Sequence, residues 1–264
     1  MLVLITGAAG HIGSVLTSRL ADDHELRGLD IVEPETGYPG DFVLGDCADP
    51  RVTARAVDGV DAVVHLAGVA TESDLPRILH SHVLTTAALL DAMVSSGVRR
   101  MVYASSNHAV GMTPRQDPLG VDIPTRPDTF YGVGKVAAEA LLSLYADRYG
   151  ISSVAMRIGS FLAAPQTKRA LSTWLSYDDC ARMVRAALTA DMEGFNLVYG
   201  ISANTDAWWD LEPGRALGYH PADDAGLAAE SVPDRAEDAV ESERVGGPFA
   251  TGQYDRRPFG DEHP

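Results

Sequence analysis

The sequence predicts an α/β fold: a Rossmann-like, doubly wound parallel sheet with a small C-terminal substrate-binding addition. Short apolar runs alternate with longer helical patterns, which is typical of βαβ units. A glycine-rich turn also joins the first apolar run to a helical pattern. The chain has 264 residues, of which 45% are hydrophobic, so it is long enough to bury one large core. We expect a catalytic domain over residues 1–221 and an acidic tail over residues 222–264.

Seven short apolar runs are predicted to form the sheet. In chain order they are Leu2–Thr6, Glu25–Asp30, Phe42–Gly45, Asp61–Leu66, Arg99–Ala104, Ser153–Ile158 and Phe195–Tyr199. The clearest helix follows Ser176, which is a good N-cap residue, and Asp178 and Asp179 suit its first turn. Its apolar side chains recur on one helical face and predict core packing.

The composition changes near Ala222 to acidic residues, glycine and proline, with isolated aromatics at Phe249, Tyr254 and Phe259. A segment this polar cannot form its own core. It either stays mobile or lays its aromatic rings on the main domain or on a neighbouring subunit.

The formal net charge of −16, from 37 acidic and 21 basic residues, excludes nucleic acid and anionic membrane surfaces as partners, because both would be repelled. Such a surface fits an ordinary soluble protein and also a salt-adapted one. The two cysteines, Cys47 and Cys180, lie far apart and suggest neither a disulfide nor a metal site. The chain starts directly on a predicted strand, and no apolar run approaches the roughly 18 residues of a membrane span. A cytoplasmic location is expected.

A dinucleotide site is predicted at the turn after the first strand. Gly7, Gly10 and Gly13 enclose His11 and Ile12 in the spacing G-x-x-G-x-x-G. Glycine lets the backbone approach a pyrophosphate, whose charge is met by the free N–H groups at the start of a helix. The spacing differs from G-x-G-x-x-G, so a purely structural turn is the alternative.

Asp30 ends the second strand, at the distance beyond the glycines where an acidic residue binds the adenosine ribose. A carboxylate repels the extra phosphate of NADP, and the following Ile31, Val32 and Glu33 supply no cation for it. Arg27 lies inside the strand. NAD is therefore the predicted cofactor, and the alternative for Asp30 is an ordinary turn residue.

Other strand ends meet the same crevice, because ligands of open α/β sheets bind at the carboxyl ends of the strands. We expect Asp46 and Cys47 to flank the adenine, with Leu66, Ala67 and Gly68 beneath the diphosphate and ribose. The remaining candidates for cofactor contact are Ile31, Ala104 and Ile158, together with Tyr131 and Lys135.

Tyr131 and Lys135 form the candidate catalytic pair. They are four residues apart at the start of a helical pattern, so they share one helical face. A nearby ammonium stabilises phenolate, and Lys135 is therefore expected to lower the pKa of Tyr131 from about 10 and make it a general base. Such a pair also occurs by chance. The strand end that leads to Ser106 supplies a hydroxyl on the same side of the sheet and favours the catalytic interpretation.

These motifs resemble the extended short-chain dehydrogenase/reductase superfamily, and their surroundings closely resemble the uronate dehydrogenases. The resemblance is collinear over nearly the whole chain. It is carried by Ala104–His108, Arg126–Asp128 leading into Tyr131–Val133, Arg157–Ser160, Leu171–Ser176, Tyr199–Asn204, Trp208–Asp210 and Gly246–Phe249.

The resemblance implies that NAD oxidises C1 of a hexuronic acid, such as D-glucuronate or D-galacturonate, to an aldarolactone. Tyr131 would take the C1 hydroxyl proton, Lys135 would hold the nicotinamide ribose, and Ser106 would orient the hydroxyl. A homo-oligomer is also implied.

The sugar-acid site implied by the resemblance consists of Asn107, His108, Ser160 and Arg169. Arg169 would pair with the substrate carboxylate, which a planar guanidinium binds through two parallel hydrogen bonds. Structural alternatives are a solvated loop charge for Arg169, a hydrogen-bonded structural histidine for His108 and a strand end for Ser160. Trp174, Trp208 and Trp209 are predicted to pack under the loops.

Two positions depart from the family pattern. Ala70 and Thr71 stand where a small polar residue is usual, which affects substrate specificity. His82 replaces an asparagine in the next helix, and a histidine titrating near neutrality would alter the pH dependence.

Alternative activities are an NAD-linked dehydrogenase of a neutral aldose or hexose phosphate, of the glucose-6-phosphate dehydrogenase type, and a non-catalytic NAD-sensing protein. A nucleotide-sugar epimerase is disfavoured because little chain remains after Ala222.

Overall fold

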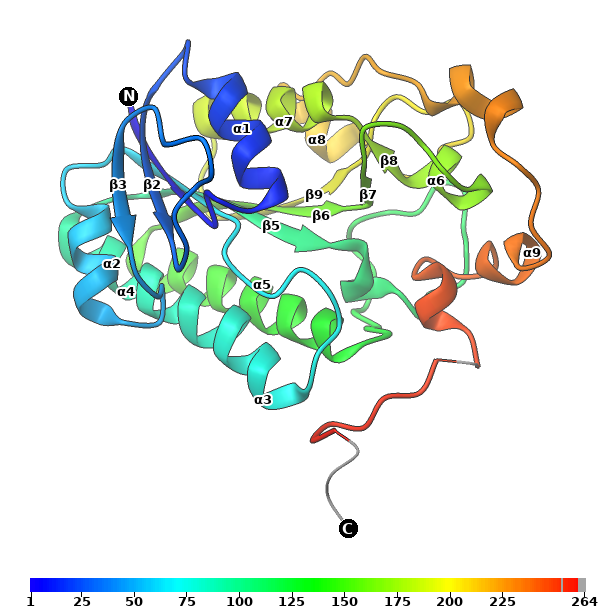
Figure 1. Ribbon diagram of the computed structural model, residues 1–264, viewed down its shortest axis with the longest axis horizontal. Coiled ribbons are helices and arrows are strands. Elements are labelled where there is room, and N and C mark those ends of the chain that lie inside the picture. The colour runs from blue at the N-terminus through cyan, green and yellow to red at the C-terminus, as the bar shows by residue number, and fades with distance from the viewer. Residues whose placement is uncertain (253, 261–264) are drawn as a thin grey trace.

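The computed structural model describes residues 1–252 and 254–260 and contains a seven-stranded sheet (Figure 1). The strand order is β3-β2-β1-β4-β5-β6-β9, and every neighbouring pair is parallel. This sheet confirms the predicted fold class. Its strands are β1 (Leu2–Thr6), β2 (Glu25–Asp30), β3 (Asp41–Leu44), β4 (Ala62–His65), β5 (Arg100–Ser106), β6 (Ser152–Ile158) and β9 (Phe195–Gly200).

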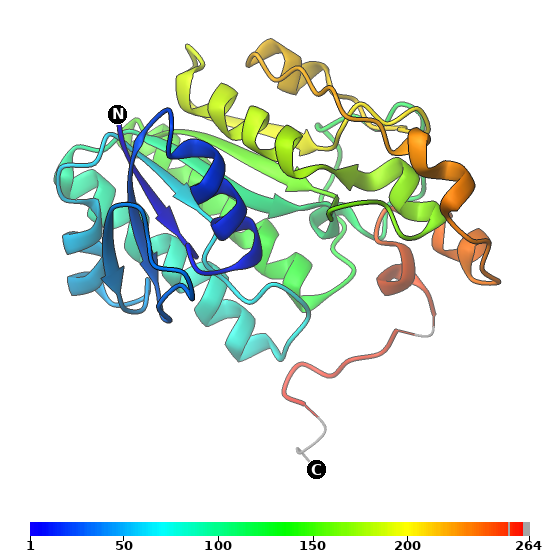
Figure 2. The same ribbon diagram turned by 45° about the horizontal axis from the view of Figure 1, so that its top comes forward.

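Helices cover both faces of the sheet, as Figures 1 and 2 show. One layer contains α1 (His11–Leu20), α7 (Tyr177–Thr189) and α8 (Glu212–Ala216). The other contains α2 (Pro50–Val57), α3 (Leu75–Ile78), α4 (Thr85–Ser96) and α5 (Phe130–Tyr149). Each layer packs on its own cluster of buried aliphatic side chains, so the strands are apolar on both faces.

Local sequence signals determine where the long helices begin and end. Ser176 caps α7 by accepting a hydrogen bond from the Asp179 amide, which confirms the predicted start of that helix. Thr129 caps α5 in the same way through the Gly132 amide, and Gly150 ends it in the left-handed conformation at φ +66°. Because the cap at Thr129 fixes the start of α5, it places Tyr131 in the first turn of this helix.

A small subdomain follows β6. It consists of a second parallel pair, β7 (Ser160–Phe161) and β8 (Trp174–Leu175), joined by α6 (Lys168–Thr173). Strands of two residues carry no periodicity that a sequence pattern could reveal, and they were not predicted. Trp174, Trp208 and Trp209 are all at most 9% exposed, which confirms that they pack under the loops.

The C-terminal segment packs on the main domain of its own chain. It forms η3 (Ala225–Ser231), α9 (Asp238–Glu241) and η4 (Gly247–Ala250), seen in orange and red in Figure 1. Val245 is completely buried in a cluster with Trp208 and Trp209, and Phe249 lies edge-on to His108 at 5.0 Å. Of the predicted tail 222–264, residue 253 and residues 261–264 lie outside the described residues.

The helical stretch Leu75–Ser96 joins α3, the π-helical turn η1 (Leu79–Leu84) and α4. Its length and mean hydropathy of 1.2 would allow it to cross a membrane, although the sequence showed no uninterrupted apolar run of that length. It packs against α2 and α5, and 44% of its most apolar window is buried inside the protein.

Candidate active site

The glycine turn after β1 fits a dinucleotide. Gly7 has φ +69°, and a Cβ there would lie 2.8 Å from the Ala67 nitrogen. A Cβ at Gly13 would lie 2.1 Å from the Gly7 oxygen, so only glycine lets the turn close on the helix. α1 starts with His11 and Ile12 after Gly10, and no side chain caps its first turn. Its first amides are therefore available to an anion.

Asp30 lies where the sequence predicts, at the end of β2 beside this turn. Its carboxylate accepts hydrogen bonds from the amides of Ala9 (2.9 Å) and Ile31 (2.7 Å). The carboxylate thus anchors the glycine turn at the carboxyl end of β2, where the sequence predicts that the adenosine ribose binds.

The neighbouring strand ends form the rest of the crevice. The amides of Leu66 and Ala67 donate to Thr6 Oγ1, each at 3.2 Å. Asp46 accepts from the Ala48 amide at 2.8 Å, and the His80 ring lies 3.2 Å away. Cys47 is 4% exposed and burial raises the pKa of its thiol to about 12, so it remains neutral.

Helix α5 brings Tyr131 and Lys135 to the end of β5. Lys135 is 4% exposed, and its Nζ donates to the Ala104 carbonyl at 2.6 Å. The same Nζ lies 5.3 Å from the centre of the Tyr131 ring. The strand continues two residues beyond the predicted end at Ala104 and carries Ser106, which is paired in register with Ile158 of β6.

The expected effect of Lys135 on Tyr131 is wrong for this structure. Burial raises the pKa of Tyr131 to about 12, and the group that lowers this pKa is the hydroxyl of Ser106, through a hydrogen bond. Burial also lowers the pKa of Lys135 to about 7, against the opposing influence of Glu139. The ammonium is desolvated and directed at Ala104, so its charge does not dominate at the phenol.

His82 is also corrected by the structure. Its ring is 1% exposed, and burial, followed by the charge of Lys135, lowers its pKa to about 2. His82 therefore stays neutral at physiological pH. Its Nε2 lies 3.0 Å from the Val69 carbonyl, and its ring packs edge-on to Tyr131 at 5.3 Å. Gly68 and Gly134 leave the space that the ring occupies.

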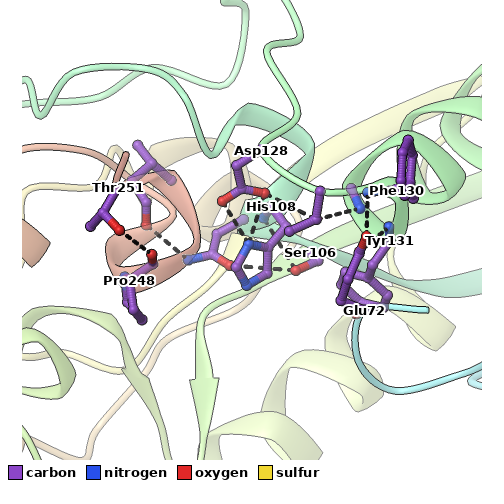
Figure 3. A network of polar contacts seen from close by, with 12 residues as sticks. Glu72, Ser106, His108, Asp128, Phe130, Tyr131, Pro248 and Thr251 are labelled. Atoms are coloured by element: carbon purple, nitrogen blue, oxygen red, sulfur yellow. Dashed lines mark hydrogen bonds and ion pairs between the residues drawn. The ribbon is translucent and has the colours of Figure 1, made fainter. Parts of the chain in front are cut away.

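Asp128 was not among the predicted site residues, although it belongs to the motif Arg126–Asp128 that carries the family resemblance. Its side chain is fully buried, and one oxygen lies 2.8 Å from Nδ1 of His108 (Figure 3). A Cβ at Gly246 of the tail would lie 1.7 Å from the same carboxylate, so only glycine lets the tail cover it. The Asp128 contact orients His108 and directs its Nε2 away from that carboxylate.

Glu72 was also missed. Its carboxylate accepts hydrogen bonds from the amides of Phe130 (3.1 Å) and Tyr131 (2.8 Å), as Figure 3 shows. These amides belong to the first turn of α5, where a carboxylate is stabilising. No local pattern reveals this contact, because Glu72 lies 59 residues before Tyr131.

The predicted sugar-acid residues meet at the tail. The Val245 carbonyl accepts hydrogen bonds from Arg169 Nη2 (2.7 Å) and from the Asn107 amide group (3.4 Å). Arg169 Nη1 donates to Ser160 Oγ at 3.5 Å, and Asn107 accepts from Ser106 at 3.4 Å. The His108 amide donates to Ser106 Oγ at 3.2 Å, so the four predicted residues join one polar network through Ser106 and Val245, and Arg169 is not a solvated loop charge.

A glycine turn after β1 and a serine, tyrosine and lysine at the end of β5 and the start of α5 define a short-chain dehydrogenase/reductase. The chain belongs to the NAD dependent epimerase/dehydratase family, whose sequence model matches residues 3–177. This membership confirms the predicted cofactor class.

Among known proteins, the chain is 38% identical to a uronate dehydrogenase of Pseudomonas syringae pv. tomato, over 98% of this chain and 95% of the relative. It is similar to the crystal structure of a uronate dehydrogenase variant from Agrobacterium tumefaciens complexed with NAD. That match has a TM-score of 0.90 and 35% identity, and covers 98% of this chain and 99% of the other. An NAD-dependent glucose-6-phosphate dehydrogenase of Haloferax volcanii is 34% identical, over 84% of this chain and 94% of the relative. The predicted resemblance to uronate dehydrogenases is confirmed.

Proposed function

We propose that the protein oxidises the C1 hydroxyl of a hexuronic acid, such as D-glucuronate or D-galacturonate, to the aldarolactone with NAD. The observation that carries this proposal is the network joining Arg169 and Ser160 to Asn107 and Ser106. This network supports the proposal because a guanidinium able to pair with the substrate carboxylate would then lie close to the hydroxyl that is proposed to orient C1. Similarity to uronate dehydrogenases over nearly the full chain supports it.

Each residue has a role in this reaction. Ser106 orients the C1 hydroxyl and hydrogen-bonds to Tyr131, which favours the phenolate, and Tyr131 in its phenolate form takes the hydroxyl proton. Lys135 holds the nicotinamide ribose, and His108, oriented by Asp128, presents Nε2 to a sugar hydroxyl. NAD, when bound, accepts the hydride from C1.

The proposed cofactor residues fit NAD better than NADP. Asp30 repels a ribose phosphate, and Ile31–Glu33 supply no cation. The remaining proposed contacts are Gly7, Gly10, His11, Ile12, Gly13, Asp46, Cys47, Leu66, Ala67, Gly68, Ala104 and Ile158.

The test is to supply NAD or NADP with glucuronate, galacturonate, glucose or glucose 6-phosphate in separate reactions and follow the absorbance of the reduced cofactor. We expect turnover of uronates with NAD, reduced by about 10²–10⁴-fold in Tyr131→Phe. Turnover of glucose 6-phosphate alone would favour the second candidate function, to which the lower similarity to the Haloferax enzyme points. No cofactor reduction with any of the four sugars would favour an NAD-sensing protein.

We also propose that residues 222–264 complete the substrate site of the domain formed by residues 1–221, because Val245 binds both Arg169 and Asn107. A homo-oligomer is proposed from the resemblance and from apolar side chains exposed on the helices, such as Leu84 (54%) and Leu144 (44%). A cytoplasmic location is proposed, since both cysteines are free. Light scattering of the purified chain tests the oligomer.

A further inference from the structure

A cavity of about 210 Å³ lies between α6 and the tail, apart from the site at Tyr131. None of Ser106, His108 and Tyr131 lines it, so it is not the place where C1 reacts. Its only proposed site residue is Arg169. The lining used below consists of Arg115, Arg169, Ser172, Trp208, Ser242 and Arg244.

Three guanidinium groups face this cavity without a carboxylate partner. Arg115 lies 5.6 Å from the centre of the Trp208 ring, and Arg244 donates to the Met112 carbonyl at 2.6 Å. Within residues 1–252 and 254–260, Arg115, Arg169 and Arg244 form no ion pair. The cavity therefore concentrates positive charge in a chain whose net charge is −16.

The acidic side chains of the lining do not cancel this charge. Glu241 is bound by Arg235, with 2.5 Å between Oε2 and Nη2, and Asp206 is exposed. Lys168, also in the lining, adds a further cation whose partner Asp234 is 93% exposed. The lining carries four cations, Arg115, Lys168, Arg169 and Arg244, against the two carboxylates of Asp206 and Glu241, so its formal charge is positive.

Arg169 Nε supplies a second, independent observation. This atom is buried and has no hydrogen-bond partner, whereas Nη1 and Nη2 of the same guanidinium are engaged. A buried donor without an acceptor is costly. Gly247 covers this atom, because a Cβ there would lie 2.3 Å from Nε, so an anion in the cavity would compensate the buried charge of the guanidinium rather than accept a hydrogen bond from Nε.

The lining identifies the class of anion. Planar guanidinium groups bind carboxylates through paired hydrogen bonds, and Ser172 and Ser242 offer hydroxyls to a polyol. We propose that this cavity binds a small hydroxylated dicarboxylate of the aldarate class and that its occupation weakens substrate binding through the shared Arg169. The identity of the ligand rests on the proposed function: water adds to C1 of the lactone product, the bond from C1 to the ring oxygen breaks, and an aldarate results.

Coupling follows from the shared residue. One guanidinium cannot pair fully with a carboxylate in each of two sites, so each ligand lowers the affinity of the other by the same factor. The aldarate would therefore act as a product inhibitor that raises the KM for the uronate and leaves kcat unchanged.

The test is isothermal titration calorimetry of galactarate into the full chain at low ionic strength. Arg115→Gln removes an exposed cavity cation, and Arg55→Gln, on the exposed face of α2, is the matched charge control. We expect galactarate to bind the unmodified chain and Arg55→Gln with equal affinity. Its affinity for Arg115→Gln should be lower by about tenfold or more. Equal affinity for all three proteins, or no binding to any, would overturn the proposal.

Kinetics separate this proposal from the proposed function. With glucuronate, Arg115→Gln should keep its kcat and KM while the inhibition constant for galactarate rises about tenfold or more. Unchanged inhibition of Arg115→Gln would indicate that galactarate binds in the Tyr131 site, and it would refute binding in the cavity. If no uronate is oxidised at all, the proposed function fails, whereas the calorimetric comparison of Arg115→Gln with Arg55→Gln still tests the cavity.

Discussion

Burial governs the chemistry of the catalytic pair at the residue scale. Tyr131 and Lys135 share a helical face, yet their pKa values move in opposite directions, to about 12 and about 7. Desolvation penalises both charged forms, phenolate and ammonium. Burial therefore favours the neutral forms of Tyr131 and Lys135 more than exposure to water would. The hydrogen bond from Ser106 is the contact that favours the phenolate of Tyr131.

The pKa of Lys135 predicts a pH dependence of stability. It is about 7 in the folded chain, against a reference value of 10.5, so between these pH values the unfolded chain binds more protons. The free energy of unfolding therefore rises with pH from about 7 to 10.5, by up to about 1.4 kcal/mol per pH unit. Lys135→Met should lack this contribution.

The measurement is urea unfolding of both proteins, followed by tryptophan fluorescence between pH 7 and pH 9.5, below the range where Tyr131 titrates. The free energy of unfolding of the unmodified chain should rise relative to that of Lys135→Met as the pH rises. A constant difference over this range would contradict the assigned burial of the ammonium.

At the scale of single elements, the start of α5 is the element most closely tied to function. Thr129 caps it from within, and Glu72 binds its first amides from the loop after β4. Tyr131 lies in this turn, so any fraying of the helix displaces the proposed base. A misplacement of about 1 Å can cost about 10²-fold in rate.

Glu72→Ala should therefore lower both stability and activity. We expect a loss of about 0.5–2 kcal/mol, typical of a helix cap, together with a fall in kcat of about tenfold or more. Asp49→Ala is the matched control, because Asp49 caps the remote α2 through the Arg51 amide at 2.8 Å. It should lose similar stability and keep its kcat. Equal kcat values in the two variants would show that Glu72 is only a structural cap.

At the scale of the whole molecule, the tail contacts the residues of the proposed substrate site. Val245 is completely buried, and its carbonyl binds Arg169 and Asn107. Phe249 packs on His108, and Pro258 accepts a hydrogen bond from the Leu75 amide at 2.8 Å. The segment thus runs from the sugar-acid residues to the helix layer below the sheet (Figure 2).

Two truncations test this role. A chain ending at Ser242 loses Val245, Gly246 and Phe249, and its KM for a uronate should rise about tenfold or more, because Arg169 and His108 lose contacts that orient them. A chain ending at Gly252 keeps those contacts and should retain its KM. Steady-state kinetics and thermal unfolding of both chains provide the comparison, and equal KM values would rule out the tail as part of the substrate site.

Local signals in the sequence were sufficient to determine much of this protein. The main strands agree within two residues, because parallel strands buried on both faces appear as short apolar runs. The glycine turn, Asp30, and the pair Tyr131 and Lys135 were predictable since each depends on spacing within one element or one turn. The cap at Ser176 was predictable for the same reason.

Tertiary structure alone decided the features that depend on distant residues and on burial. Asp128 contacts His108, which is 20 positions away in the sequence. Glu72 and Tyr131 are 59 positions apart, and Arg169 and Val245 are 76 positions apart. No local periodicity encodes such contacts. The neutral state of His82 and the opposed pKa shifts of Tyr131 and Lys135 were equally hidden, because desolvation depends on everything packed around a group and a sequence pattern describes only its neighbours along the chain.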